Sequence, residues 1–382
     1  MAKVAFVAVG ADNVSVEVLS QQLKNYGHKT MLAFERALFD DQMYYTVGWL
    51  NKFLNNEKSL IQDIKQFKPD FVAFTVLVDT YHWSIDFARK LRQHTDASII
   101  FGGIHAMTSS EEIIKKDEVD IVCVGEGQDA LLELANSFDA GEINYSIKNL
   151  WFKYDNDVIK NGYRPVLDDV NLLPYPDKSI IKHRWNIRDY YLTVTNYGCI
   201  EKCTFCQQNF YAKLQSDNNL GRFFREKSPS NVLEELKLAK EKYGIRYVDI
   251  KNNVLTSSKK WYKEFLTRYP DEVGVPFRVM VHPRQMKLEY CELLKNAGCD
   301  HAQMGVESLD EKIKIDVIKR HDTNKHVYEA IENMEKVGLR YSLDFIFGLP
   351  GQKVEELDKG ARLVASLKNC IRASVFWCQY LP

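Results

Sequence analysis

Three cysteines lie close together in the middle of the chain, with the spacing Cys-x-x-x-Cys-x-x-Cys. They are Cys199, Cys203 and Cys206, and they follow an alternating stretch at residues 191–195 that is typical of a strand. Thiolates bind both iron–sulfur clusters and zinc, but a structural zinc site usually has four protein ligands, and the nearest preceding histidine is only His183. Three thiolates would hold three irons of a four-iron cluster and leave the fourth iron open. A zinc knuckle and unligated core cysteines are the alternatives.

This spacing, the aromatic Phe205 before the last cysteine and the strand that leads into the motif resemble the radical S-adenosylmethionine (radical SAM) enzymes. The resemblance implies that SAM chelates the open iron, and that an electron from the reduced cluster cleaves SAM to a 5′-deoxyadenosyl radical. It also implies a partner that donates electrons, such as a flavodoxin or a ferredoxin.

The composition is that of an ordinary globular protein. The chain has 382 residues, of which 45% are hydrophobic and 27% are charged, so two or three domains are expected. Its net charge is −1 with no long run of one sign, and we therefore expect no nucleic-acid partner. No apolar run approaches the roughly 20 residues that cross a bilayer. Eight cysteines without a dense disulfide pattern favour a reducing, cytoplasmic location.

Residues 1–140 alternate between strand and helix patterns. Strands are predicted at residues 3–9, 29–34, 70–76, 98–101 and 120–124, with helices at 14–26, 60–67 and 84–93. This alternation predicts an α/β domain with a doubly wound, Rossmann-like or flavodoxin-like parallel sheet, which binds ligands at the carboxyl ends of its strands. The aromatic segment 39–54 is expected to cover that ligand face.

Small and polar residues follow three of these predicted strands. Thr75 and Leu77 lie at the end of the strand predicted at 70–76. Gly102, Gly103 and His105 follow the strand at 98–101, and Gly125, Glu126 and Gly127 follow the strand at 120–124. Two glycines at a strand end let the backbone approach a large ligand closely. The positions resemble the cobalamin-binding domain, in which a Ser-x-Leu and a Gly-Gly line the channel for the nucleotide tail. The resemblance implies that all these residues contribute to a cobalamin site.

One motif of that family is missing here. The family has Asp-x-His-x-x-Gly after its first strand and binds cobalt through the histidine, whereas residues 12–17 read DNVSVE. Val14 stands at the histidine position, so this loop is expected to offer no cobalt ligand. His82 could face cobalamin, but a hydrogen-bonded structural role is the commoner one for a lone histidine beside aromatic residues. A domain that has lost its cofactor is the alternative.

The rest of the chain is predicted to be a linker at residues 141–188 and a second α/β domain at residues 189–382. Further strands are predicted at 247–251, 277–281, 301–308, 341–347 and 374–380, with helices at 230–243, 259–268, 288–297, 326–337 and 355–367. With the strand before the cysteines, six strands suit the partial (β/α)6 TIM barrel implied by the resemblance. Relatives continue beyond this point, so we expect the chain to be truncated after Pro382.

Several residues at the predicted strand ends match SAM-binding motifs of the resembled family. Gly305, Glu307 and Ser308 match the motif that contacts the ribose and carboxylate of SAM, and Gly348 matches the adenine-binding turn. Arg284 could pair with the SAM carboxylate or be a solvated loop residue. Asn252 and Asn253 replace two acidic residues of cobalamin-type relatives, and their amide oxygens could still accept hydrogen bonds from the SAM amine.

Together, the resemblances imply an enzyme with a 4Fe-4S cluster, SAM and cobalamin as cofactors. The expected function is methylation of an unactivated carbon or phosphorus centre in a small-molecule or peptide substrate. A radical SAM cyclase, oxidoreductase or methylthiotransferase-like enzyme without methyl transfer from cobalt is the first alternative. A non-catalytic cobalamin-binding or scaffold protein is the second.

Overall fold

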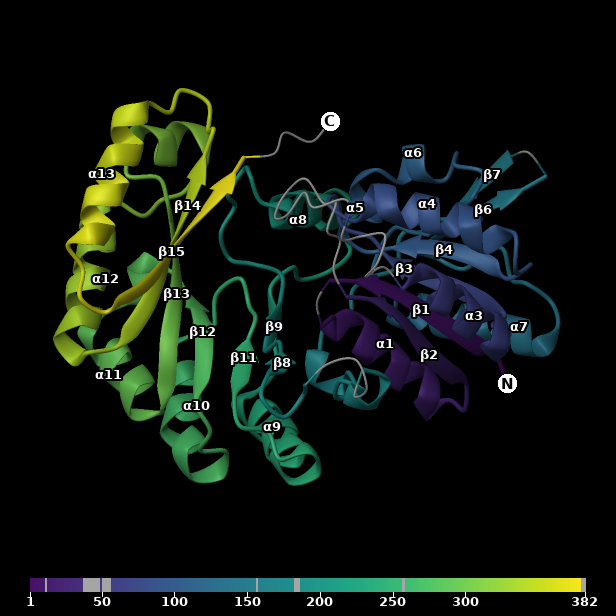
Figure 1. Ribbon diagram of the computed structural model, residues 1–382, viewed down its shortest axis with the longest axis horizontal. Coiled ribbons are helices and arrows are strands. Elements are labelled where there is room, and N and C mark those ends of the chain that lie inside the picture. Colours follow the sequence, from purple (N-terminus) through teal and green to yellow (C-terminus); the bar gives the residue numbers. More distant parts are fainter. Residues whose placement is uncertain are drawn as a thin grey trace. The chain divides into compact units, whose positions relative to one another are not determined.

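The computed structural model describes residues 1–378, except for 11, 37–48, 50–55, 156, 182–185 and 256–257. Most of the aromatic segment 39–54, His183 and the end of the chain at 379–382 therefore lie outside the described residues. Contacts within the chain define two compact units (Figure 1). Unit 1 comprises Met1–Val166 and Leu173–Trp185, and unit 2 comprises Leu167–Leu172 and Asn186–Pro382.

Unit 1 is built on a seven-stranded sheet with the order β2-β1-β3-β4-β5-β6-β7. The five parallel strands are β1 (Lys3–Val9), β2 (Lys29–Glu35), β3 (Phe71–Thr75), β4 (Ser98–Gly102) and β5 (Ile121–Cys123). The helices are α1 (Val14–Asn25), α3 (Glu57–Phe67), α4 (Tyr81–Arg92), α5 (Ile104–Thr108), α6 (Ser110–Ile113) and α7 (Gln128–Ala140). The parallel order 2-1-3-4-5 is that of a flavodoxin-like sheet, and it confirms the predicted α/β fold.

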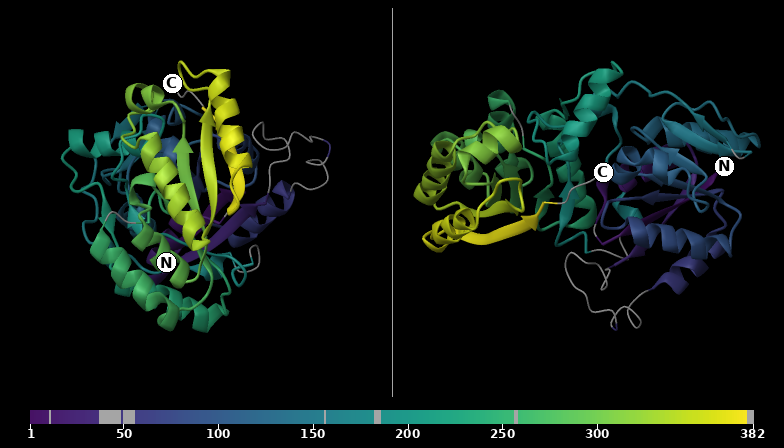
Figure 2. Two further views of the ribbon diagram at one scale, coloured as in Figure 1. Left: turned by 90° about the vertical axis from the view of Figure 1, so that its left-hand side faces the viewer. Right: turned by 90° about the horizontal axis from the view of Figure 1, so that it is seen from above.

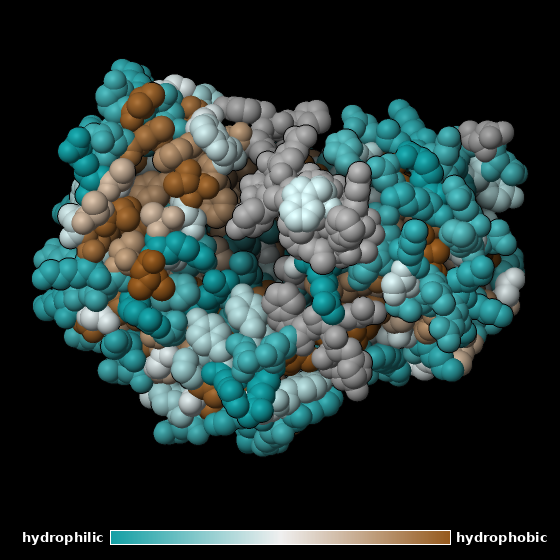
Figure 3. Space-filling view, in the orientation of Figure 1, coloured by the Kyte–Doolittle hydropathy of each residue, from teal (hydrophilic) through white to brown (hydrophobic). Residues whose placement is uncertain are grey.

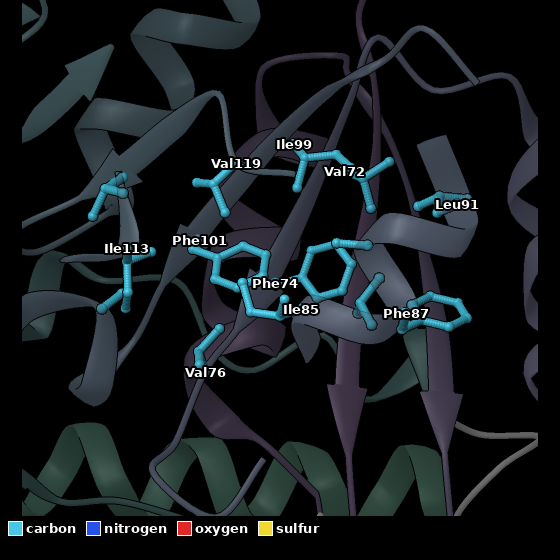
Figure 4. Close-up of a cluster of buried hydrophobic side chains, with 14 of the residues drawn as sticks. Val72, Phe74, Val76, Ile85, Phe87, Leu91, Ile99, Phe101, Ile113 and Val119 are labelled. Atoms are coloured by element: carbon cyan, nitrogen blue, oxygen red, sulfur yellow. The ribbon is translucent and has the colours of Figure 1, made fainter. Parts of the chain in front are cut away.

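The core of unit 1 is formed by the central strands and the helices that cover them. Phe74 of β3 packs against Phe101 of β4 with ring centroids 4.9 Å apart, and Phe87 of α4 lies beside them (Figure 4). Strands covered by helices on both faces must be apolar at successive positions. The runs in β1, β3 and β4 satisfy this requirement, which explains why they were recognisable in the sequence.

The segment predicted as a linker contributes two strands to the same sheet. β6 (Leu150–Tyr154) pairs antiparallel with β5, and β7 (Asp157–Lys160) pairs antiparallel with β6. Only the first three residues of β6 are buried and none of β7 is, so the segment lacks the long apolar runs of the parallel strands. The chain then contributes Leu167–Leu172 to unit 2 before it returns to unit 1.

Unit 2 contains a six-stranded, fully parallel sheet with the order β15-β14-β13-β12-β11-β8. Its strands are β8 (Tyr191–Thr193), β11 (Val248–Ile250), β12 (Phe277–Val281), β13 (Cys299–Glu307), β14 (Arg340–Phe347) and β15 (Cys370–Trp377). Its helices are α8 (Gln207–Asp217), α9 (Pro229–Tyr243), α10 (Lys259–Glu272), α11 (Leu288–Asn296), α12 (Asn324–Val337) and α13 (Val354–Ala365). Helices α10 to α13 cover one side of this sheet (Figures 1 and 2). The parallel α/β fold predicted for this half of the chain is confirmed.

Strand β15 forms one edge of this sheet, and much of it is exposed. Val375, Phe376 and Trp377 are among its exposed apolar residues, and Val354 of α13 is exposed too. The space-filling view shows hydrophobic residues gathered on the part of unit 2 where α13 and β15 lie (Figure 3). None of the described helices is long and apolar enough to cross a membrane.

Candidate functional site

The cysteine loop follows β8 through the short strand β9 (Asn196–Tyr197), which pairs antiparallel with β10 (Arg225–Glu226). Gly198 begins the loop with a φ of +81°. A Cβ atom at this position would lie against the carbonyl oxygen of Phe223, well inside van der Waals contact. Only glycine combines this backbone conformation with this close approach, so Gly198 fixes the direction in which the three cysteines leave the sheet.

The three cysteines are free thiols in one continuous loop that ends at α8. The backbone N–H of Glu201 donates a hydrogen bond to Cys199 Sγ at 3.4 Å. Cys206 is the residue directly before the first turn of α8, and burial raises the pKa of its thiol although a backbone hydrogen bond from Gln208 opposes the shift. Burial raises the pKa of Cys203 to about 12, against the opposing charge of Arg320. Metal binding must therefore displace protons from these thiols.

The donor set fits a cubane cluster better than a single ion. Among the described residues, no three Cys, His, Asp or Glu side chains converge as they would on one metal ion. A cubane needs another arrangement, because each thiolate binds a different iron. Cys206 interacts electrostatically with both Cys199 and Cys203, so the three thiols lie near one another. That they bind three irons of a cluster and leave the fourth open stays a prediction.

The cysteine loop rests on a π-helix that the sequence pattern did not predict. This helix, η4 (Ile313–Val317), follows β13. Thr204 donates from its backbone N–H to the carbonyl oxygen of Ile318 at 3.1 Å and from its hydroxyl to that of Val317 at 2.8 Å. Single turns of π-helix are frequent at functional sites. Here the turn presents carbonyl groups to the loop between the second and third cysteines.

A buried network centred on Arg320 lies behind this support. Arg320 Nη1 donates to Glu307 Oε1 at 2.8 Å, Nη2 donates to the Gly305 carbonyl at 2.6 Å, and Nε donates to Asp322. Asp322 also pairs with Lys314 at 2.8 Å, and both of these side chains are fully buried. Arg320 thus connects the end of β13 to the segment under the cysteine loop. Sequence analysis missed this network, because its charges look like surface residues until the chain is folded.

Glu307 and Gly305 lie together at the end of β13, where the sequence predicts contacts with SAM. Glu307 is a non-glycine residue with φ of +65°, a conformation that is uncommon and often found at functional sites. Its carboxylate folds back over Gly305, where a Cβ atom would collide with it. Burial raises the pKa of Glu307, and Arg320 opposes the shift. Ser308 is buried and donates to Glu356 of α13, which fixes the turn after the motif.

The other predicted SAM residues differ in how they are placed. Asn253 Nδ2 donates to the Gly198 carbonyl at 3.0 Å, so this side chain touches the cysteine loop. Asn252 is buried, and its amide bonds to Thr195 and to the Leu255 carbonyl within the protein. Its contact with SAM remains a prediction. Arg284 is half exposed and lies 3.9 Å from Glu201 of the cysteine loop, an arrangement that the sequence did not indicate.

Two further predicted residues lie at the outer part of the site. Gly348 follows β14 with φ of +80°, and its N–H donates to Gln352 Oε1 at 2.9 Å. A Cβ atom there would be 3.5 Å from the Trp377 ring. Phe205 is partly exposed between the second and third cysteines. That Gly348 and Phe205 contact a cofactor stays a prediction.

Replacing Gly198 by alanine should prevent cluster assembly, because the new methyl group collides with the Phe223 carbonyl. We expect Gly198→Ala to lose most of its iron after anaerobic reconstitution. Gly244→Ala is the matched control, since Gly244 has φ of +62° and no atom near its Cβ position. The control should lose only about 1 kcal/mol of stability from backbone strain. Equal iron contents in the two variants would contradict the role of Gly198.

In unit 1, the predicted cobalamin residues gather at the carboxyl ends of β3 and β4. Thr75 pairs in register with Gly102, and Leu77 is partly exposed just beyond. Gly103 has φ of +93°, and a Cβ atom there would be 3.0 Å from the Val76 nitrogen. His105 packs edge-on against Tyr81 at 4.6 Å between ring centroids, and its Nδ1 atom has no hydrogen-bond partner among the described residues.

The Gly125-Glu126-Gly127 turn is held by Asn149, a residue that sequence analysis missed. Asn149 Nδ2 donates to the Glu126 carbonyl at 2.9 Å, and its Oδ1 accepts from the Arg164 N–H at 2.8 Å. A Cβ atom at Gly125 would lie 2.5 Å from the Asn149 side chain, so this glycine is required. Asn149 precedes β6, so the segment predicted as a linker takes part in shaping the turn.

Val14 begins α1 and is buried, and Asn13 before it makes the bonds at this helix start. Asn13 Oδ1 accepts from the Val16 N–H at 3.2 Å, which caps the helix. Its Nδ2 donates to Thr75 Oγ1 at 3.3 Å. The loop after β1 therefore contacts the end of β3 through Asn13, and it has no histidine at the position where the resembled family binds cobalt.

The variant Gly102→Ala tests whether Gly102 is needed for cobalamin binding or for the stability of the fold. The added methyl group would meet Cys123 Cβ at 3.5 Å, an ordinary contact, so the fold should tolerate it. We expect unchanged thermal stability and a weakening of hydroxocobalamin binding of about tenfold, because the methyl group occupies the surface that the corrinoid approaches. Gly141→Ala, at the C-terminal cap of α7, is the control and should bind normally. Normal binding by Gly102→Ala would remove Gly102 from the site.

Comparisons with known proteins find a match for each of the two domains. Residues 193–364 match the radical SAM superfamily model, and residues 7–135 match the B12 binding domain model. An uncharacterized methyltransferase of Pyrococcus horikoshii is 23% identical over 310 residues, which cover 80% of this chain and 66% of the relative. Cytidylyl-2-hydroxyethylphosphonate methyltransferase of Streptomyces wedmorensis is 19% identical, with coverage of 88% and 70%. The chain thus spans about two thirds of the length of these relatives.

The structure of the radical SAM methyltransferase TsrM from Kitasatospora setae, solved with tryptophan substrate and a SAM analogue bound, has the same fold, with a TM-score of 0.77 at 16% identity. That match covers 98% of this chain and 73% of TsrM. The chain therefore carries a radical SAM domain and a B12-binding domain. These two domains imply a 4Fe-4S cluster, SAM and cobalamin as cofactors, and radical SAM chemistry needs a reductant.

Proposed function

We propose that this chain is a cobalamin-dependent radical SAM methyltransferase that methylates an unactivated carbon or phosphorus centre of a small-molecule or peptide substrate. The observation that carries the proposal is the presence of a B12-binding domain and a radical SAM domain in one chain. The methyltransferase names of relatives in Pyrococcus horikoshii and Streptomyces wedmorensis support methyl transfer over other radical chemistry. A flavodoxin or ferredoxin is the proposed electron donor.

The chain's own residues divide this work between the two units. When bound, the cofactors supply the radical and the methyl group, and the protein supplies binding, orientation and exclusion of water. Cys199, Cys203 and Cys206 would hold three irons of the cluster. Glu307, set by Arg320, would accept hydrogen bonds from the SAM ribose or amine at the end of β13. In unit 1, the backbone around Gly102 would pack against the corrinoid.

The products of SAM test this proposal. Each methylation should yield one 5′-deoxyadenosine from radical formation and one S-adenosylhomocysteine from remethylation of cobalt. The assay uses the protein loaded with cluster and hydroxocobalamin, a low-potential reductant and candidate substrates, and it counts both products against methylated substrate. Comparable amounts of the two are expected. Coupled turnover that gives 5′-deoxyadenosine without S-adenosylhomocysteine would favour a cyclase or oxidoreductase and overturn methyl transfer. Cobalamin binding without any SAM cleavage would favour a scaffold protein.

A further inference from the structure

A buried group of three charged side chains lies at the carboxyl end of β1, apart from the residues assigned to cobalamin by sequence. Lys178 Nζ lies 2.9 Å from Asp12 Oδ2 and 2.7 Å from Glu17 Oε2. These three side chains, here called the Lys178 cluster, are 1%, 2% and 0% exposed. Asp12 belongs to the β1–α1 loop, Glu17 to the first turn of α1, and Lys178 to the short helix η2 (Lys178–Ile180) of the returning segment.

Stability alone does not explain the Lys178 cluster. Buried ion pairs can often be replaced by apolar side chains without loss of stability, because desolvation offsets their attraction. Here two carboxylates share one ammonium group, and Asp12 Oδ1 and Glu17 Oε1 have no hydrogen-bond partner among the described residues. Burial raises the pKa of Glu17 well above its usual value; Lys178 opposes the shift, and the neighbouring Asp12 carboxylate adds to it. An arrangement this unfavourable to bury is expected to fix a specific local conformation.

The conformation that it fixes is that of the β1–α1 loop. Asp12 directly precedes Asn13, which donates a hydrogen bond to Thr75 at the end of β3. Thr75 in turn pairs in register with Gly102. A short chain of contacts therefore leads from Lys178 through the loop to the predicted cobalamin residues, although Lys178 itself is too buried to touch a ligand.

The returning segment is also held to α1 by contacts that do not involve Lys178. The backbone N–H of Asp177 donates to the Glu17 carbonyl at 3.2 Å. Asp177 Oδ2 accepts hydrogen bonds from Ser20 Oγ and Lys24 Nζ, both at 2.6 Å. Lys24 helps to attach the returning segment to α1 but, in the part of the chain that the structure describes, makes no hydrogen bond or ion pair with the β1–α1 loop. Mutation of Lys24 can therefore test attachment of the segment separately from the conformation of the loop.

We propose that Lys178 is a positioning residue for the corrinoid. Its ion pairs with Asp12 and Glu17 hold the β1–α1 loop in the conformation that receives cobalamin, in a domain whose loop offers no histidine to cobalt. This inference rests on the proposed function, because it presupposes that unit 1 binds cobalamin. It assigns a role in cofactor binding to a residue from the stretch that the sequence suggested was only a linker.

The test compares Lys178→Met with Lys24→Met in the full chain, by titration with hydroxocobalamin monitored by absorbance. Lys178→Met leaves two buried carboxylates without a counter-ion, so the loop should move and cobalamin binding should weaken by about tenfold or more. Lys24→Met removes a partly exposed partner of Asp177 and should change binding less than about twofold. Iron content and the spectrum of the reconstituted cluster should be unchanged in both variants. Lys178→Arg keeps the charge and should recover most of the binding.

Wild-type affinity in Lys178→Met would overturn the inference, and so would an equal loss in Lys24→Met, because attachment of the segment would then suffice. If Lys178→Met does not fold, the triple variant Asp12→Asn, Glu17→Gln, Lys178→Met takes its place. The triple variant buries no charge, so its cobalamin affinity can still be measured. It should fold and bind cobalamin more weakly than the wild type, and normal binding would again refute the role of Lys178. Failure of the wild-type protein itself to bind cobalamin would instead count against the proposed function.

Discussion

Cys203→Ala should abolish the iron–sulfur cluster. After anaerobic reconstitution with iron and sulfide, the wild-type chain should carry about four irons, and the variant should lose nearly all of them together with the Mössbauer signature of a four-iron cluster. The physical reason is that Cys203 is the most buried of the three thiols and lies between the other two in the loop, so that the remaining pair cannot enclose a cubane. SAM cleavage should be lost with the cluster.

Cys291→Ala is the matched control for this experiment. Cys291 is also a buried free thiol, but it belongs to α11 and packs in the core of unit 2. Its replacement removes one sulfur atom from an apolar setting and should leave the iron content unchanged, with a modest loss of stability. An intact, SAM-cleaving cluster in Cys203→Ala would contradict the assignment of the cysteine loop as the cluster ligand. Loss of iron in both variants would point to unfolding.

Arg320→Met should weaken SAM binding without removing a cluster ligand. The substitution leaves the buried carboxylates of Glu307 and Asp322 without their shared guanidinium group, and breaking such a buried pair typically costs about 3–5 kcal/mol. Glu307 should then leave its left-handed conformation over Gly305. We expect a lower melting temperature and SAM binding that is lost or strongly weakened, as measured by calorimetry on the reconstituted protein.

Two further variants show whether SAM binding depends on the geometry of the Arg320 guanidinium group. Arg320→Lys keeps the charge but cannot donate to Glu307, Asp322 and the Gly305 carbonyl at once, so its SAM affinity should lie between those of the wild type and Arg320→Met. Arg362→Met removes a surface arginine that is 79% exposed and pairs with Asp358 one turn away, and it should behave as wild type. SAM affinity in Arg320→Met equal to that of the wild type would show that Glu307 needs no buried partner.

The parts of this protein that could be predicted from sequence are those determined by local patterns. The spacing of the three cysteines is a local property, and the parallel sheets follow from apolar runs that are buried on both faces, as in β1 and β4. The glycines at strand ends, such as Gly102 and Gly305, were also recognisable by position. A Cβ atom at Gly305 would collide with the Glu307 carboxylate, whereas one at Gly102 would make only an ordinary contact, so packing explains the first glycine and not the second.

Other features depend on contacts between distant parts of the chain and could not be derived in this way. Lys178 and Asp12 are 166 residues apart, and no periodicity connects them. Lys314 of the π-helix pairs with Asp322 eight residues later, beyond the end of that helix, so no single helical period joins the two. The edge strand β7 has no buried residue and therefore no apolar signal. Asn252 illustrates the reverse problem, since its residue type suited a ligand contact while its amide is bonded within the protein.

The return of the chain to unit 1 after Leu167–Leu172 has a consequence for synthesis on the ribosome. Asp12 and Glu17 emerge early, whereas Lys178 follows only after the first residues of unit 2 have been made. Until then, the nascent first domain carries two carboxylates that cannot be buried without their counter-ion. Unit 1 can therefore complete its fold only after residue 178 has been made, which is still before the main part of unit 2 at Asn186–Pro382. With Lys178 in its proposed role, the corrinoid site would reach its final form only when translation has passed residue 178, shortly before unit 2 continues at Asn186.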